Sequence, residues 1–532
     1  MVFTDNTAVT AAVVGGIGAV ALLLGSALLP RQRGAGLRCP DGRPARKIHT
    51  LETTLPVLGN LLDYLEHEAR LYDWLTANVL KFNGEPYQIS IPGQGAIIIV
   101  STPDAIEEIT TTQIHNFPKG EYQNEALRDL LGAGLVASDG DRWYRQRKAA
   151  IRFFTAKVLR TLMKDVMRKN LERVCEVIDR STAAGEQTDL RDLFMAFTME
   201  TFMGVGIGVE LDCIGATTPH PFLEGLDAAA PATGTRFRRP TWFWKLQRFL
   251  NVGEERTLRE GMQLVRTWLR ETIDAALKES MAKRDVALPE ETSMRTVIEL
   301  FLEYGEGLNE EDLVDFILTF VFAARDTTAE TLTWLFYVIG HRPDIEQKLR
   351  AEMSEKELST SYLTTEHIKD LVYLEAVIKE TLRLYPAAPY TLRECAADTV
   401  ICGDIVLRKG ALLGTPSYAL ARNPNVWGPD ASEFRPERWI DQATGKIKHV
   451  EPSKFFTFSA GPRTCIGMNL AMLELRVVAA NLLYRYKFDV DPRNDGSYIV
   501  APTLMMKHPL LVRAERIVKE ANIEGARRPH AA

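Results

Sequence analysis

The sequence predicts a mainly α-helical fold with a smaller β part, an α+β class, preceded by one N-terminal membrane-spanning helix. Long helical patterns run, with breaks, from about residue 103 to residue 384. Short extended patterns occur both before and after this region. An uncharged stretch opens the chain. We therefore expect one large helical body with strands drawn from both ends of the chain.

Composition excludes several classes of protein. Of 532 residues, 46% are hydrophobic and 25% are charged, as in an ordinary globular protein. The 64 basic and 70 acidic residues give a net charge of −6, so nothing indicates nucleic-acid binding. Six cysteines without a C-x-x-C pair and nine histidines without an H-x-x-x-H pair provide neither a disulfide scaffold nor a recognisable zinc site. A cysteine that does chemistry here is expected to act alone.

The N-terminal stretch has the length and flanks of a membrane anchor. Residues 8–29 are 22 consecutive residues without a charge, and a helix of that length reaches about 33 Å. Arg31 and Arg33 follow it, whereas only Asp5 carries a charge before it, so the positive-inside bias places the rest of the protein in the cytosol. A cleaved signal peptide is the alternative, but it requires a basic region before a shorter apolar core.

Domain boundaries follow from composition. A segment rich in Gly, Pro and Arg comes after the anchor, and no internal repeat or second linker interrupts the chain beyond it. We expect an anchor over residues 1–33, a linker over residues 34–56 and one domain over residues 57–532. Within that domain the strand patterns are Tyr87–Ile91, Ala96–Val100, and extended segments near Thr391–Leu413 and Asp489–Val512.

The longest predicted helix carries a polar island. It begins at Asn309, a good N-cap, and three acidic residues fill its positively polarised first turn. It runs to Gly340, interpreted as its C′ residue, over about 30 residues or roughly 45 Å. Asp326-Thr327-Thr328 interrupts its apolar middle. Burying a carboxylate without a partner is costly, so this island indicates a functional need.

One cysteine lies in a setting suited to chemistry. Gly461 and Gly467 bracket Cys465, and glycine permits tight turns and close backbone approach. A helical pattern, Met468–Tyr484, starts directly afterwards. The N-terminus of that helix favours a thiolate, and Arg463 adds positive charge nearby. The alternative is a small buried cysteine without a reactive role.

This loop resembles the haem-binding signature of the cytochrome P450 family, F-x-x-G-x-R-x-C-x-G. The signature is matched in full, by Phe458, Gly461, Arg463, Cys465 and Gly467. The resemblance implies the cytochrome P450 fold for the whole domain. It also implies that Cys465 is the axial thiolate ligand of a haem b iron, which favours O–O bond cleavage.

Two further motifs support the resemblance. Glu380 and Arg383 match the family's E-x-x-R, and Arg438 in a following P-E-R-W element completes a structural charge network. Trp143 and Arg147 match its W-x-x-x-R, which implies contact with a haem propionate because Arg binds carboxylates through a bidentate fork. The alternatives are a solvated ion pair for the first motif and an exposed Arg beside a core Trp for the second.

The polar island resembles the family's oxygen-activation motif, A-G-x-D-T-T. Ala323 matches, but Ala324 replaces the usual Gly. The resemblance implies that Thr327 donates a hydrogen bond to iron-bound dioxygen and that Asp326 passes protons from solvent. The alternative is a helix kink caused by hydroxyl back-bonding.

Several softer blocks resemble the fatty-acid and alkane ω-hydroxylases of fungi and plants, including the block Phe117-Pro118-Lys119-Gly120. Animal relatives often carry at the position of Ala323 a Glu that is esterified to haem, so we expect non-covalent haem here. Candidates to meet a substrate carboxylate are Lys119, Arg236, Arg238 and Arg239, with a solvated basic face or a membrane-surface contact as the alternative. Candidate substrate contacts by family position are Phe117, Lys119, Ala323, Ala324, Leu392 and Leu504.

The resemblance implies a membrane-anchored monooxygenase of the endoplasmic reticulum with a cytosolic catalytic domain and a lipophilic substrate. Electrons from NADPH are expected through a reductase, with cytochrome b5 as a further donor, and O2 as co-substrate. Lys454, Arg463 and Arg145 are candidates for a basic docking patch. The alternatives are a sterol, terpenoid or xenobiotic monooxygenase, a reductase-independent peroxide-rearranging member, and a non-catalytic haem-binding membrane protein.

Overall fold

The computed structural model describes residues 38–92, 94–154, 156–284, 298, 309–355 and 362–517. The predicted membrane anchor, including residues 8–29, lies outside these ranges. Within them, no helix is both long enough and apolar enough to cross a bilayer.

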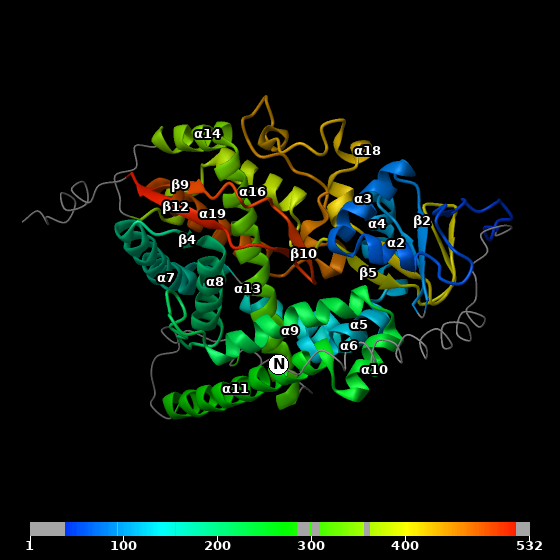
Figure 1. The fold of residues 1–532 in the computed structure, drawn as a ribbon, viewed down its shortest axis with the longest axis horizontal. Coiled ribbons are helices and arrows are strands. Elements are labelled where there is room, and N and C mark those ends of the chain that lie inside the picture. Colours follow the sequence, from blue (N-terminus) through cyan, green and yellow to red (C-terminus); the bar gives the residue numbers. More distant parts are fainter. Residues whose placement is uncertain are drawn as a thin grey trace, which may run out of the picture.

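Helices form most of the structure, as predicted, and they pack around the long central helix α13 (Figure 1). The described helices are α2 (Leu61–Glu66), α3 (Leu71–Lys81), α4 (Pro103–Glu107), α5 (Gly120–Leu131), α6 (Gly140–Phe153), α7 (Ala156–Ala184), α8 (Leu190–Gly206), α9 (Pro221–Arg238), α10 (Thr241–Leu250), α11 (Gly253–Arg284), α13 (Glu310–His341), α14 (Pro343–Ser354), α15 (Thr365–Ile368), α16 (Val372–Leu384), α17 (Ser417–Ala421), α18 (Pro424–Trp427) and α19 (Met468–Arg485).

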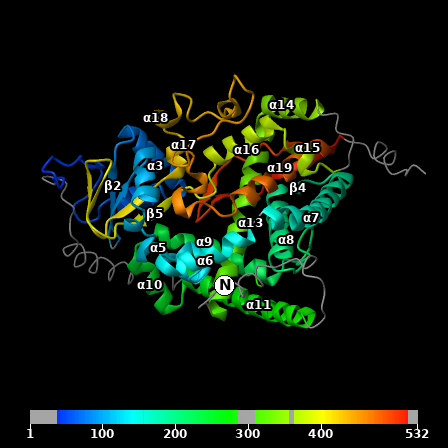
Figure 2. The same cartoon turned by 180° about the vertical axis from the view of Figure 1, so that it is seen from behind.

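The β part is smaller and is drawn from distant segments. A five-stranded sheet has the order β1-β2-β3-β8-β5, so strands near the N-terminus pair with strands some 300 residues later, and a three-stranded sheet has the order β4-β12-β9. Both views place the first sheet at one end of the molecule, opposite α7 and α8 (Figures 1 and 2). The strands are β1 (His49–Thr50), β2 (Tyr87–Ile91), β3 (Gly95–Ile99), β4 (Thr188–Asp189), β5 (Thr391–Glu394), β6 (Thr399–Ile401), β7 (Ile405–Leu407), β8 (Leu412–Thr415), β9 (Tyr486–Val490), β10 (Tyr498–Val500), β11 (Leu504–Met506) and β12 (Leu511–Arg516).

The domain begins earlier than the composition suggested. β1 lies within the predicted linker, and it pairs in parallel with β2 through His49 and Tyr87. Arg46 also forms an ion pair with Asp404 at 2.9 Å, and Cys39 is buried. The Gly- and Pro-rich composition therefore reflects an irregular path over the domain rather than a free tether.

Helix α13 confirms the predicted start and corrects the predicted end. The Asn309 side chain accepts a hydrogen bond from the Asp312 backbone N–H, and the Asp312 carboxylate accepts one from the Asn309 N–H, which closes a capping box. The helix continues through Gly340 to His341, so Gly340 is not a C′ residue. A Cβ at Gly340 would lie 2.1 Å from the side chain of Val490, so glycine is required there for close approach of β9.

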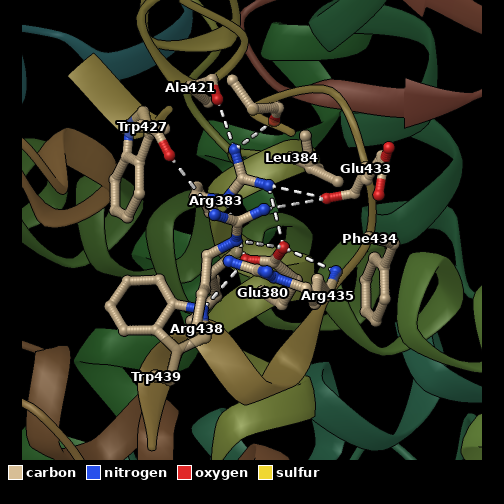
Figure 3. A network of polar contacts seen from close by, with 12 residues as sticks. Glu380, Arg383, Leu384, Ala421, Trp427, Glu433, Phe434, Arg435, Arg438 and Trp439 are labelled. Carbon is tan, nitrogen blue, oxygen red and sulfur yellow. Dashed lines mark hydrogen bonds and ion pairs between the residues drawn. The ribbon is translucent and has the colours of Figure 1, made fainter. Parts of the chain in front are cut away.

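A buried charge network joins α16 to the chain that leads to the cysteine loop (Figure 3). The Glu380 carboxylate accepts hydrogen bonds from Arg383, Arg438 and the indole N–H of Trp439, each at 2.8–2.9 Å. The backbone N–H of Arg435 is a further donor at 2.8 Å. Glu380 and Arg383 are almost fully buried, so each charge depends on the other for solvation.

Replacing Glu380 by Gln should lower the free energy of unfolding by about 3–5 kcal/mol, because it strands two buried guanidinium groups. Urea denaturation of the haem-loaded protein measures this. Glu437→Gln is the matched control, because Glu437 pairs with Lys348 at 2.6 Å on the surface and should cost under about 1 kcal/mol. Equal losses in the free energy of unfolding in the two variants would contradict the view that burial makes the Glu380 network more stabilising than the surface pair.

Candidate functional site

A cavity of about 340 Å³ lies between α13 and the loop that precedes α19, and Cys465 lines it. Helix α6 and the segment from the end of α16 to β5 complete the wall. Much of the lining is small or apolar, in the residues Leu135, Val136, Phe154, Phe320, Ala323, Ala324, Ala387 and Ala388. Such a chamber suits a flat or aliphatic ligand more than a polar one.

The cysteine loop is held in shape by backbone contacts. Gly461 has φ +63°, and a Cβ there would lie 2.2 Å from the carbonyl oxygen of Thr110, so only glycine fits. The Cys465 N–H donates to the carbonyl of Phe458 at 2.8 Å. α19 then begins at Met468, as the sequence predicts.

The surroundings of the thiol differ in part from the expectation. Burial raises the pKa of Cys465, while the N–H groups of Gly467 and Met468 and the charge of Arg147 lower it. Arg463 does not serve the thiolate, because its guanidinium pairs with Asp139 at 2.6 Å. Burial therefore opposes the charged form of the thiol, and a metal ion bound at the sulfur would favour the thiolate.

Four cationic side chains line one part of the cavity: Lys119, Arg147, Arg393 and Arg463. Asp139 faces them and pairs with Arg463. Burial and the charges of Arg393 and Arg463 hold the pKa of Lys119 well below its ordinary value, and burial lowers the pKa of Arg393 to about 10. This surplus of positive charge fits an anionic group, and the two propionates of a haem satisfy that requirement.

Trp143 and Arg147 lie together, as their spacing on one helix predicts. The Arg147 guanidinium lies 5.7 Å from the Trp143 ring centroid, and Arg463 lies 4.4 Å from it on the chain that carries the cysteine. Arg147 also donates to the carbonyl of Thr464 at 2.9 Å. The indole thus connects α6 to the cysteine loop.

The polar island of α13 is divided between two environments. Thr327 lines the cavity, and its hydroxyl donates to the carbonyl of Ala323 at 2.7 Å. Its proton is therefore committed to its own helix, and it presents oxygen lone pairs until that bond is exchanged. Asp326 is 3% exposed and does not line the cavity, so the carboxyl and the hydroxyl do not meet directly.

Three predicted substrate contacts line the cavity and three do not. Lys119, Ala323 and Ala324 are among the lining residues. Leu392 is turned away because side chains alternate along β5, where its neighbours Thr391 and Arg393 reach the cavity. Phe117 and Leu504 are fully buried in the core, where neither reaches the cavity.

Arg236 is also not available to a substrate. It is 1% exposed and forms ion pairs with Glu255 at 2.6 Å and Asp129 at 2.7 Å. It also donates to the carbonyl of Ala126 and lies over the ring of Trp244. These contacts tie α9 to α5, α10 and α11, so its role is structural.

Two titratable residues of the cavity are not marked by any sequence motif. Arg393 is a single cation in a short strand and carries no motif of its own. Glu474 lies on α19, is 5% exposed, and accepts no hydrogen bond from the described residues. Burial raises its pKa to about 8, so the carboxyl is neutral at pH 7. Only the folded arrangement shows that either residue reaches the cavity.

A cysteine on a glycine-bent loop at a helix N-terminus, below an apolar chamber with a cationic edge, defines a haem-thiolate protein. The family model described as Cytochrome P450 matches residues 50–514, so the chain belongs to the cytochrome P450 family.

Curated relatives agree with this assignment. Cytochrome P450 94B1 of Arabidopsis thaliana is 31% identical over 87% of this chain and 91% of the relative. Cytochrome P450 86B1 of the same plant is 32% identical over 83% of this chain and 81% of the relative. Cytochrome P450 monooxygenase cyp1 of Mycosarcoma maydis is 31% identical over 86% of this chain and 74% of the relative. The protein is thus a monooxygenase with cysteine-ligated haem b, O2 as co-substrate, electrons from a reductase and a lipophilic substrate.

Glu474 should make stability depend on pH. Its pKa is raised by burial from 4.5 to about 8, so between these values the folded protein keeps a proton that the unfolded chain has released. The free energy of unfolding therefore falls as pH rises through this window. Glu474→Gln should remove that part of the fall, measured by thermal unfolding of the haem-loaded protein at about pH 6 and about pH 9. Glu186→Gln, on an exposed carboxylate, is the control, and parallel curves for Glu474→Gln and wild type would contradict the assignment.

Proposed function

We propose that this protein hydroxylates a long-chain fatty acid or an alkane, with the terminal carbon as the preferred position. The observation that carries the proposal is the apolar wall of the cavity beside Cys465 and Thr327. An alkyl chain needs dry, small-walled space near the reacting centre and few polar contacts. Ala323 and Ala324 provide such a wall on α13.

The Cys465 sulfur would bind the haem iron, and the haem would supply the activation of O2 and of the C–H bond. The proposed contacts to the haem propionates are Trp143 and Arg147 on α6 and Arg463 on the cysteine loop. Arg393 and Lys119 extend the same cationic edge, which makes Lys119 a haem-side contact rather than a separate carboxylate site.

The signature residues around the ligand shape its loop. Gly461 permits the close approach of the loop to Thr110, and Phe458 accepts the Cys465 N–H. Gly467 donates to the sulfur at the start of α19. Haem binding without a covalent bond is supported by Ala323, which offers no carboxyl for an ester.

Proton delivery is assigned to Thr327 and Asp326. The Thr327 oxygen at the cavity wall can hold a water molecule or receive a proton while its own hydrogen bonds to Ala323. Asp326 does not line the cavity, so protons from solvent would pass to Thr327 by rearrangement of the carboxyl or through water.

We propose an N-terminal anchor in the endoplasmic reticulum membrane and a catalytic domain in the cytosol. The uncharged stretch 8–29 and the arginines after it support the anchor and its orientation, and the family resemblance supports the choice of membrane. Lys454 and Arg145 are the proposed docking contacts for a reductase, with cytochrome b5 as a further donor. Arg463 does not take part in docking, because its side chain is 8% exposed and pairs with Asp139.

Titration of the full-length protein in detergent with fatty acids and alkanes of increasing length tests the substrate class. A low-spin to high-spin change in the haem spectrum that saturates within one range of chain lengths is expected, because the alkyl chain displaces water from the chamber. Titrations with the solvent alone, without ligand, give the baseline. A response to sterols or xenobiotics alone would replace the aliphatic assignment while leaving the haem-thiolate assignment intact.

Thr327→Ala should lower the product formed per NADPH by about tenfold or more while NADPH consumption continues and peroxide is released. The reason is the loss of the hydroxyl that holds the proton path at the cavity wall. Thr333→Ala is the matched control: Thr333 makes the same back-bond on the same helix, to Ala329 at 2.8 Å, but does not line the cavity. An unchanged product yield in Thr327→Ala would exclude Thr327 from proton delivery.

A further inference from the structure

Arg325 carries a buried guanidinium that two carboxylates share. It lies on α13 directly before Asp326, and its side chain is 8% exposed. Its Nη1 lies 2.7 Å from the Asp227 carboxylate and 3.5 Å from that of Asp326. The guanidinium is therefore engaged with Asp227 and only loosely with Asp326. Its Nε is buried and finds no acceptor in the described part of the chain, so the group has an unused donor.

Asp227 comes from a different helix and reaches solvent. It lies on α9, and its side chain is 59% exposed. Its position is fixed by a close crossing of α9 on α11, because a Cβ at Gly225 would lie 2.7 Å from the carbonyl oxygen of Gly261. With α9 packed this closely on α11, the Asp227 carboxylate reaches the guanidinium of Arg325 on α13.

The other cation near Asp326, Arg191, is paired with a different carboxylate. Arg191 on α8 pairs with Glu330, one turn further along α13, at 2.7 Å. The 3.5 Å approach of Arg325 is the only hydrogen bond of the Asp326 carboxylate found among the described residues. The sharing of the Arg325 guanidinium between Asp227 and Asp326 therefore decides how strongly the ionised form of Asp326 is stabilised.

We propose that Asp227 is a positioning residue for proton delivery: it draws the Arg325 guanidinium away from Asp326 and so leaves the Asp326 carboxyl able to take up a proton. The inference rests on the proposed role of Asp326 in the monooxygenase reaction. It adds that α9, which does not line the cavity, controls the acid on α13 through one shared arginine.

The charges around Asp326 set the sign of each substitution. Arg325 and Glu330 face it from α13, Arg191 from α8 and Asp227 from α9, and the thiol of Cys213 lies beside Arg325. Burial raises the pKa of Asp326. The charges of Arg325 and Arg191 lower this pKa, and the charge of Asp227 raises it. Removing the Asp227 charge should therefore lower the pKa of Asp326, both directly and by releasing Arg325 to it. Removing the Arg325 charge should raise it.

The test is a pH titration of the Asp326 carboxyl in the resting, haem-loaded, full-length protein. The infrared band of its protonated C=O is identified by subtraction of Asp326→Asn. Relative to wild type, the midpoint should move to lower pH in Asp227→Asn and to higher pH in Arg325→Gln, and Asp227→Glu should restore it. A purely structural role for Asp227 would not give shifts of opposite sign. Product per NADPH should also begin to fall at lower pH in Asp227→Asn than in wild type.

Glu224→Gln is the matched control, because it removes an equal charge from the exposed face of the same helix. A midpoint that moves equally in Asp227→Asn and Glu224→Gln, or in neither, overturns the proposal. If Asp326→Asn keeps full product per NADPH while the opposite midpoint shifts appear, the proposed proton role of Asp326 is wrong and the sharing of Arg325 stands. Should Arg325→Gln fail to fold, Asp227→Asn and its Glu rescue still decide, since Asp227 is largely exposed.

Discussion

The structure depends on the solvation of one buried carboxylate by its own chain. Glu380 has no exposed surface, and five donors from three side chains and one backbone amide replace its water. These donors come from α16 and from the segment that ends at Trp439. The cysteine loop is attached to the same helix, because the Thr457 hydroxyl donates to the carbonyl of Leu382 at 2.7 Å. The network therefore holds the support on which Cys465 is presented.

Charge is distributed unevenly around the cavity. This distribution matches the two groups that the cavity would hold, a haem and a lipophilic substrate. Cationic side chains gather at one edge, beyond what Asp139 can balance, while the wall on α13 is apolar. Glu474, the carboxyl at the cavity wall, is kept neutral by burial. Positive charge at the edge favours the propionates of a haem, and the absence of an anion on the wall suits an alkyl chain.

The acid and the hydroxyl of the oxygen motif belong to two separate networks. Thr327 is oriented by its own helix through Ala323, whereas Asp326 contacts Arg325, which also pairs with Asp227 on α9. The proposed proton path could therefore be adjusted from α9 without any change in the cavity wall. On this proposal, the position of α9 is linked to a reaction step at the cavity wall.

The sequence by itself determined the family, the cysteine loop and the main elements, because these depend on local patterns. The capping box at Asn309, the strand at Tyr87–Ile91 and the glycine-bracketed Cys465 are each specified within a few residues. What the tertiary structure decided were relations between distant segments. Gly340 is required by contact with β9 rather than by a helix end, and Arg393 joins the cationic edge although no motif marks it. Periodicity and motif spacing report backbone geometry, whereas the neighbours of a side chain, and hence its charge state, are set only when the chain has folded.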